Sequence, residues 1–291
     1  MVKIRVPATS ANIGPGFDTL GMALNLYGEF TFAEKPDGLQ ITGCDPKFQN
    51  NENLVYQSFL AGLSHLRKTA PGVSIDIRSD IPVARGLGSS SSCVIGGILG
   101  AYGLTGSPVD RNAVFSMATA IEGHPDNVSP AIFGGLTASC AIGGRAWYKK
   151  YDMDPRFHLL ALIPDFEVNT ADARRAMPGS YSLSDVTYSS SRLGVVLKSF
   201  EDYDKDLLRI AMDDRIHEPY RKKLIREYDE VRALCREIDS VCLFISGSGS
   251  TLINILEQEE NAAVIGEKLK GLQCGWTARL LKLDTEGAKI L

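Results

Sequence analysis

The stretch Ile81-Pro-Val-Ala-Arg-Gly-Leu-Gly-Ser-Ser-Ser-Ser-Cys93 is the most informative part of this chain. Gly86 and Gly88 can adopt positive φ and bring the backbone close to a ligand, which a residue with a Cβ does only at a cost. Four serines follow, and with the apolar run 93–95 they predict a helix that begins at Ser91. A helix N-terminus offers unpaired N–H groups and favours anions. The stretch therefore predicts a loop that binds a polyphosphate.

Two common nucleotide-binding signatures are excluded for this loop. A Walker loop ends in Gly-Lys-Ser/Thr, and no lysine stands between Ser79 and Tyr148. A dinucleotide fingerprint needs a third glycine three residues after Gly88, where Ser91 stands. The structural alternative is a Gly/Ser-rich surface turn, which Pro82 and the helix directly after the loop disfavour.

The composition favours metabolite chemistry over nucleic-acid binding. The 291 residues, 44% of them hydrophobic, are enough for two domains with substantial cores. The net charge is −4, and no basic cluster is denser than Arg221-Lys222-Lys223, so no nucleic-acid partner is expected. The six cysteines show no C-x-x-C spacing, which argues against a zinc site and against a disulfide framework.

The sequence gives no sign of export or membrane insertion. The segment Met1–Val6 alternates polar and apolar residues and lacks the apolar core of a signal peptide. The most apolar window, around Cys93–Leu104, is interrupted by glycines and is shorter than the roughly 18 residues needed to span a bilayer. We therefore expect a cytoplasmic protein with no membrane partner.

Several predicted strands precede the first long helix, which favours an α+β fold over a doubly wound one. Alternating segments predict strands over Val2–Val6, ended by Pro7, and over 26–33, 39–42 and 73–78. The charged segment 149–156 contains Pro155 and is the predicted boundary between an N-terminal domain, 1–154, and a C-terminal domain, 155–291.

Two further polar segments are candidate ligand sites. Pro7-Ala-Thr-Ser-Ala-Asn-Ile-Gly-Pro-Gly-Phe-Asp18 is a turn of small residues in which Asn12 and Asp18 offer one amide and one carboxylate. Its alternative is an ordinary connection in which Asn and Asp serve turn chemistry. The segment Glu122-Gly-His-Pro-Asp-Asn127 gathers two carboxylates, a histidine and an amide between apolar flanks, which is unusual in a core.

These segments together resemble the motifs of the GHMP kinases, the superfamily of galactokinase, homoserine, mevalonate and phosphomevalonate kinases. Residues 82–91 resemble the second motif, and 7–18 resemble the first in the form seen in homoserine kinases. Residues 122–135 are similar to E-G-H-x-D-N-V-x-P-x-x-x-G-G of that group, although many members carry an insertion after the Glu. Val241–Leu252 resembles the third motif, with Ser250 as a small departure.

The resemblance runs from Val6 to beyond Leu252 and implies a two-domain GHMP kinase fold. That fold is α+β, with a ribosomal protein S5 domain 2-like N-terminal domain and a ferredoxin-like C-terminal domain. The implied cofactors are ATP and Mg²⁺. Glu122 matches the magnesium ligand of the superfamily, facing Ser90, and hard oxygen atoms suit that ion. Asn53 matches the adenine pocket, although it also reads as a helix N-cap. The implied nucleotide-binding residues are Pro82, Val83, Ala84, Arg85, Gly86, Leu87, Gly88, Ser89, Ser90, Ser91, Ser92 and Asn53.

The resemblance also implies the substrate. Arg174 and Arg221 match two arginines of homoserine kinases, and two guanidiniums on separate elements can clamp one carboxylate. The implied activity is the ATP-dependent phosphorylation of the L-homoserine hydroxyl to O-phospho-L-homoserine, a step of threonine biosynthesis. The implied partner is a small molecule, and a homodimer is expected because relatives are often dimers. The candidate substrate residues are Asn12, Asp18, His124, Asn127, Arg174 and Arg221.

The expected catalytic residues are Asn127, Glu122 and Asp18. Asn127 cannot accept a proton, so we expect it to orient the hydroxyl while alignment and charge neutralisation supply the acceleration. Asp126 is the rival base, and His124 also reads as a histidine held by a backbone carbonyl. Two other functions remain open: a kinase for another small hydroxy acid such as mevalonate, and a non-catalytic ligand sensor with this fold.

Overall fold

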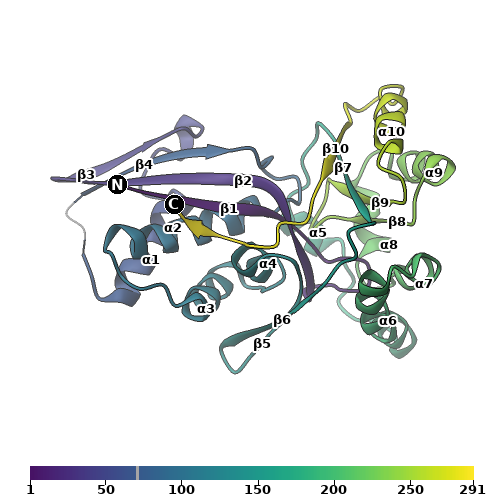
Figure 1. Ribbon diagram of the computed structural model, residues 1–291, viewed down its shortest axis with the longest axis horizontal. Helices are drawn as coiled ribbons and strands as arrows, with labels where there is room; N and C mark the ends of the chain where they lie inside the picture. The colour runs from purple at the N-terminus through teal and green to yellow at the C-terminus, as the bar shows by residue number, and fades with distance from the viewer. Residues whose placement is uncertain (70–71) are drawn as a thin grey trace.

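A computed structural model describes residues 1–69 and 72–291 (Figure 1). The first sheet has the order β11-β1-β2-β4-β3, and β2 also pairs with β5, which pairs with β6. Its pairs are antiparallel except for β3 and β4. The strands are β1 (Val2–Ala11), β2 (Leu20–Lys35), β3 (Gly38–Thr42), β4 (Gly72–Ser79), β5 (Leu136–Ile142), β6 (Arg145–Tyr151) and β11 (Lys289–Ile290).

Helices cover one face of this sheet (Figure 1). They are α1 (Leu54–Leu66), α2 (Ser89–Leu104), α3 (Arg111–Glu122) and α4 (Val128–Phe133), and a short turn, η1 (Pro46–Phe48), precedes α1. The first core lies between the helices and the sheet, where Phe30 and Phe32 of β2 meet Ile95 and Ile98 of α2. Asn53 caps α1 by accepting a hydrogen bond from Val55 N at 2.9 Å, as its sequence context predicted.

The second sheet has the order β10-β7-β9-β8 and is antiparallel. Its strands are β7 (His158–Ile163), β8 (Cys242–Ile245), β9 (Leu252–Leu256) and β10 (Thr277–Leu281). The remaining helices are α5 (Thr170–Arg175), α6 (Leu183–Asp202), α7 (Lys205–Ala211), α8 (Glu218–Arg221), η2 (Lys222–Leu224), α9 (Tyr228–Ile238) and α10 (Asn261–Leu269).

Side chains on both faces of the second sheet are buried. Leu160 and Leu162 of β7 belong to a core formed with α9 and α10. Leu159 and Ala161, on the opposite face, belong to a core formed with α6, α7 and the first residues of β2. Burial on both faces explains why β7 reads as a continuous apolar run instead of an alternating one. The second of these cores joins the two sheets across the middle of the molecule.

The prediction that Pro7 ends the first strand was wrong. β1 continues to Ala11, and its pairing with β2 shifts register between Pro7 and Ala8. A bulge accommodates a residue without an N–H, because the ladder hydrogen bonds are already interrupted there. The bulge lets β1 continue without a break from Val2 to the residue before Asn12.

Some element bounds also differ from the sequence reading. The helix expected to begin at Ser91 begins at Ser89. The amphipathic pattern of residues 224–237 predicts a helix from Leu224, but α9 begins at Tyr228 after the turn η2. The strand β11 was not predicted, and it pairs with β1 so that both chain ends lie on the first sheet (Figure 1). The boundary at Pro155 stays a prediction. The structure adds that β11, which follows the second sheet in the sequence, lies in the first sheet. No helix in the described part of the chain is long and apolar enough to cross a membrane.

Gly96, Gly97 and Gly100 each cost a helix about 1 kcal/mol relative to alanine, which predicts close packing of this helix against a neighbouring element. The glycines of α2 do pack closely against their neighbours. A Cβ at Gly97 would overlap the backbone oxygen of Val55 on α1. A Cβ at Gly100 would overlap the ring of Phe32 on β2. In contrast, nothing lies within 4 Å of a Cβ built at Gly194 on α6.

We expect Gly97→Ala to lower the free energy of unfolding by about 1–3 kcal/mol, because the added methyl group forces α1 and α2 apart. Gly194→Ala is the matched control, and it should raise the free energy of unfolding by about 1 kcal/mol because alanine is the better helix former. Urea denaturation followed by circular dichroism measures both changes. Equal effects of the two substitutions would contradict the packing of α2 described here.

Candidate active site

The phosphate loop, residues 81–88, leads directly into α2. Gly88 occupies the N-cap position in the left-handed conformation, with φ +71°, and no side chain caps the helix. The first-turn N–H groups of a helix lack partners within the helix. Those of Ser89, Ser90 and Ser91 therefore lie at the end of α2 that faces the cavity described below. The helix dipole makes this end attractive to a negatively charged group.

Gly86 and Gly88 are required by contacts within the protein as well as by their positive φ. A Cβ at Gly88 would overlap Oγ1 of Thr9 on β1, and one at Gly86 would overlap the backbone oxygen of Ser246 after β8. The interpretation that glycine serves close approach to a ligand is therefore incomplete. These residues also let the loop pack against both of its neighbouring segments.

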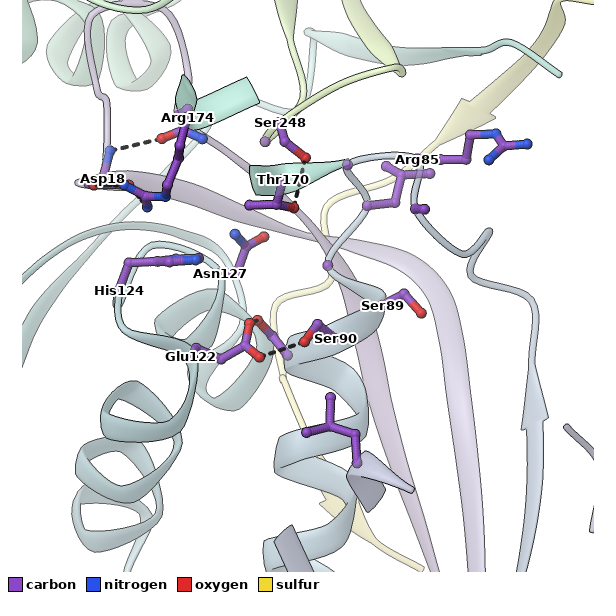
Figure 2. Close-up of a pocket in the computed structure, with 18 of the residues that line it drawn as sticks. Asp18, Arg85, Ser89, Ser90, Glu122, His124, Asn127, Thr170, Arg174 and Ser248 are labelled. Carbon is purple, nitrogen blue, oxygen red and sulfur yellow. Dashed lines mark hydrogen bonds and ion pairs between the residues drawn. The ribbon is translucent and has the colours of Figure 1, made fainter. Parts of the chain in front are cut away.

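A cavity of about 410 Å³ opens beside this loop (Figure 2). It brings together most of the residues predicted from sequence, which come from both halves of the chain. Val83 is 63% exposed, and Pro82, Ser92 and Asn53 do not line the cavity. The lining residues are Asn12, Asp18, Leu54, Ala84, Arg85, Gly86, Leu87, Gly88, Ser89, Ser90, Ser91, Ile121, Glu122, His124, Asn127, Thr170, Arg174, Arg221, Gly247 and Ser248.

Glu122 lies at the C-terminal end of α3 and faces the first turn of α2 (Figure 2). Ser90 Oγ donates to Glu122 Oε1 at 2.6 Å, and Ser91 Oγ donates to Oε2 at 2.6 Å. The helix ends here because Gly123 adopts φ +85°. The two serines fix the carboxylate at the edge of the phosphate loop.

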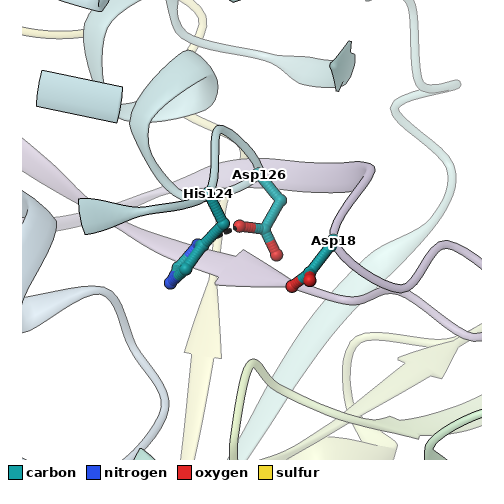
Figure 3. Close-up of side chains that lie close together, drawn as sticks. All are labelled: Asp18, His124 and Asp126. Carbon is teal, nitrogen blue, oxygen red and sulfur yellow. Dashed lines mark hydrogen bonds and ion pairs between the residues drawn. The ribbon is translucent and has the colours of Figure 1, made fainter. Parts of the chain in front are cut away.

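His124 and Asp126 form a hydrogen-bonded pair (Figure 3). His124 Nδ1 lies 2.5 Å from Asp126 Oδ1, and Asp126 is fully buried. This hydrogen bond raises the pKa of His124 above its ordinary value, against the opposing effect of burial. His124 lines the cavity, and Asp126 does not. Asp126 Oδ1 also accepts from Asn127 N at 3.0 Å.

Asn127 and Asn12 are held by single hydrogen bonds. Thr9 Oγ1 donates to Asn127 Oδ1 at 2.7 Å, which leaves the amide nitrogen of Asn127 to donate elsewhere. Asn12 Oδ1 accepts from Asp18 N at 2.8 Å and so closes the turn between β1 and β2. Asn12 and Asp18 adopt positive φ, 59° and 49°, which Asn and Asp tolerate better than most residues.

Arg174 and Arg221 approach the cavity from the second half of the chain. Arg174 on α5 donates through both terminal nitrogens to Asp18, at 2.9 and 3.2 Å (Figure 2). Arg221 on α8 is 2% exposed and donates to Gly247 O at 2.9 Å. Burial, and next the nearby Arg174 charge, lower the pKa of Arg221. Both guanidiniums lie over the ring of Phe17, at 5.7 and 4.9 Å from its centre.

Comparisons with known proteins agree with this geometry. The family model "GHMP kinases N terminal domain" matches residues 53–135, and "GHMP kinases C terminal" matches 196–272. A homoserine kinase of Clostridium botulinum is 39% identical over 292 residues, which cover 100% of this chain and 98% of the relative. The chain belongs to the GHMP kinase family.

Solved GHMP kinase structures share the whole fold. The crystal structure of a homoserine kinase from Cytophaga hutchinsonii matches with a TM-score of 0.89 at 26% identity, covering 100% of this chain and 97% of that one. A mevalonate kinase of L. major, in complex with R-mevalonate, matches with a TM-score of 0.74 at 15% identity, over 98% and 95% of the two chains. The predicted two-domain GHMP kinase fold and the predicted ATP-dependent kinase class are confirmed.

Sequence reasoning missed several residues at the active site of this GHMP kinase. Thr9 lies within the first motif, where its contact with Asn127 was not foreseen. Thr170 and Ser248 line the cavity, and their hydroxyl oxygens are 3.3 Å apart. Ser248 lies in the third motif, which had been noted but not assigned to the site. Thr170 follows the N-cap Asn169 of α5, and it stands at the first position of the family pattern [ST]-x-x-A-R-x-x-[LM]-P that residues 170–178 resemble. That pattern had indicated Arg174 alone as a site residue.

We expect Asp126→Asn to lower the pKa of His124, because the carboxylate that favours the imidazolium is removed. A raised pKa stabilises the folded state fully below the unfolded value of about 6.5, and this stabilisation is lost as pH rises through the folded pKa. The pH-dependent difference in unfolding free energy between wild type and variant should therefore be greatest in acid and disappear in base.

Histidine resonances in an NMR titration, together with urea denaturation at several pH values, measure these effects. Asp206→Asn is the control, because Asp206 is an exposed carboxylate on α7 that pairs with Arg209. A His124 titration unchanged by Asp126→Asn would contradict the proposed pairing.

Proposed function

We propose that this GHMP kinase is a homoserine kinase, which transfers the terminal phosphoryl group of ATP to the side-chain hydroxyl of L-homoserine. One observation carries the proposal: Arg174 and Arg221, from separate helices, line the same cavity as the phosphate loop. A phosphate-binding surface and a pair of guanidiniums suit a phosphoryl donor and a carboxylate-bearing acceptor. The homoserine kinases among its relatives support the same acceptor.

The phosphate loop fits a nucleotide triphosphate. The uncapped end of α2 and the hydroxyl group of Ser89 supply donors without a lysine, while the hydroxyl groups of Ser90 and Ser91 donate to Glu122. Arg85 is turned away from this surface, since it donates to Pro164 O and Asp165 O and pairs with Glu167. We therefore assign the triphosphate to the main-chain amides of the loop and of the first turn of α2, together with the Ser89 hydroxyl group. Arg85 is then part of the support behind the loop.

Glu122 and Ser90 fit Mg²⁺, because both present hard oxygen atoms at one side of the loop. When bound, this ion would neutralise charge on the β- and γ-phosphates. Glu122 is held in place by two hydroxyl groups, so its carboxylate needs little reorganisation to serve as a ligand. Ser91 is a second hydroxyl at the same carboxylate, and it orients Glu122 from the other oxygen.

The proposed substrate site presents two guanidinium groups and one carboxylate to the cavity. Arg174 and Arg221 would bind the homoserine carboxylate, and Asp18 would accept a hydrogen bond from its ammonium group. In the structure Asp18 pairs with Arg174, which keeps both groups oriented before the substrate arrives. A zwitterion satisfies both charges at once, whereas a simple hydroxy acid leaves Asp18 without a cationic partner beyond Arg174.

Asn127 would orient the hydroxyl group of homoserine through its amide nitrogen, since its oxygen is engaged by Thr9. An amide cannot take up the proton, so catalysis would depend on alignment and on charge neutralisation in a loose transition state. The rival base, Asp126, is fully buried and is not among the residues that line the cavity. Its proposed role is to orient His124.

The two alternative functions make different demands on these residues. A mevalonate-like acceptor would have no ammonium group for Asp18. A non-catalytic sensor would have no use for the hydroxyl pair that holds Glu122 against the phosphate loop. Neither alternative accounts for the full set of cavity residues, and homoserine does.

We expect purified protein with ATP and Mg²⁺ to phosphorylate L-homoserine, and to show little turnover with mevalonate or free sugars. A coupled assay of ADP release, with the product identified by mass spectrometry, measures this. Omitting either homoserine or Mg²⁺ should abolish ADP release. Equal turnover with mevalonate, or turnover with none of these acceptors, would overturn the proposal.

We expect Arg174→Gln to raise the KM for homoserine about 10- to 100-fold, because charged hydrogen bonds to a carboxylate contribute about 1.5–3 kcal/mol. The KM for ATP should change little. Arg175→Gln is a matched control on the same helix, since Arg175 is exposed and pairs with Asp172 away from the cavity. If both variants raised the KM for homoserine equally, Arg174 would have no specific role in binding it.

A further inference from the structure

A second cavity, of about 700 Å³, lies in the C-terminal half of the molecule. Its walls come from α7, α9 and the edge strand β8, which lie together at one end of the structure (Figure 1). Within the described residues, β8 pairs with β9 alone. Its outer edge is bonded to a side chain, because Ile245 N donates to Glu218 Oε1 at 2.9 Å. The cavity therefore opens onto an unpaired strand edge that one carboxyl group partly occupies.

Two arginines of this cavity lack an ionic partner. Arg232 and Arg236 lie one turn apart on the same side of α9, and both line the cavity. Among residues 1–69 and 72–291, no carboxylate lies within ion-pair distance of either guanidinium. Arg209 on the opposite wall differs, because it pairs with Asp206 and Glu257.

The acidic groups of the cavity are already engaged. Asp239 accepts from Glu257 N, Gln258 N and Asn261, and Asp213 accepts from Tyr188. Burial raises the pKa of Glu218 to about 8, so its carboxyl group is mostly uncharged at neutral pH. Arg232 and Arg236 are therefore the guanidiniums of this wall without an ion-pair partner in the described part of the chain. Planar guanidiniums match carboxylate and phosphate oxygens.

We propose that the second cavity binds a small anion through Arg232 and Arg236, and that its occupancy is coupled to the substrate site. The ligand class is a metabolite with carboxylate or phosphate oxygens. The neutral Glu218 carboxyl can donate a hydrogen bond to such an anion, in place of the repulsion that an ionised carboxylate would exert.

The short helix α8 connects the two cavities. Glu218 at its start lines the second cavity, and Arg221 at its end lines the active-site cavity. Each end is bonded to the same strand and loop, Glu218 to Ile245 N and Arg221 to Gly247 O. An anion that moves Glu218, or that changes its hydrogen bond to Ile245 N, therefore acts on α8, the helix that positions Arg221. Coupling of this kind is reciprocal, because each ligand must change the affinity of the other by the same factor.

Isothermal titration calorimetry tests the binding directly, with no need for turnover. The protein is first saturated with Mg²⁺ and a non-hydrolysable ATP analogue so that the phosphate loop is filled. Sodium sulfate and sodium succinate are then titrated against sodium chloride at equal ionic strength. We expect saturable binding of at least one probe, with sulfate indicating a phosphate ligand and succinate a carboxylate ligand.

The double variant Arg232→Gln/Arg236→Gln should weaken this binding at least tenfold. Arg279→Gln is the matched control, since Arg279 is exposed on β10 at the opposite edge of the same sheet, and it should bind like wild type. Heat no greater than that of chloride, or equal affinity in wild type and double variant, would overturn the anion site. Thermal melts of each variant show whether it is folded.

Homoserine binding, measured in the same instrument with and without the anion, tests the coupling. We expect a change in homoserine affinity of at least threefold, a matching change in anion affinity, and neither change in the double variant. Unchanged affinities would overturn the coupling. An anion site without any homoserine binding would instead contradict the proposed function and leave the second site standing.

Discussion

The active site depends on the packing of the phosphate loop between two segments that are far apart in the sequence. Thr9 N donates to Leu87 O at 3.1 Å, and Thr251 N donates to Arg85 O at 3.1 Å. Ser246 Oγ donates to Gly86 O at 2.7 Å. These bonds fix the loop against β1 and against the turn after β8. The carbonyl groups of Arg85, Gly86 and Leu87 are therefore hydrogen-bonded on that side, and the amide groups of the loop are directed to the cavity.

Much of the fold could be predicted from local signals. Asn53, read as an N-cap, predicted the start of α1, and the Gly/Ser stretch predicted the loop and the start of α2 to within two residues. Longer-range features could not be read in this way. The continuation of β1 past Pro7 depends on a bulge that only pairing with β2 creates, and β11 is too short to carry a pattern.

The sequence predicted which residues lie at the site better than it predicted the contacts between them. Asp18, Glu122 and Arg174 were all expected at one site, and the cavity contains all three. The resemblance implied that Glu122 faces Ser90, and these two residues are hydrogen-bonded. The second bond of Glu122, from Ser91, and the pairing of Asp18 with Arg174 were not foreseen. Asn53 shows the opposite case, because its side chain is consumed by capping α1 and by a bond to Phe48 O. A residue with two plausible roles can be assigned only when its neighbours are known.

The pairing of β11 with β1 places the last residues of the chain within the sheet that its first residues begin. During synthesis, that sheet would have to wait for its edge strand until the ribosome has made the whole second sheet. Until then the outer side of β1 would expose unpaired N–H and C=O groups, which are templates for pairing with another chain. A nascent chain arrested near Pro155 would be exposed to aggregation for this reason, independently of how well its core is packed.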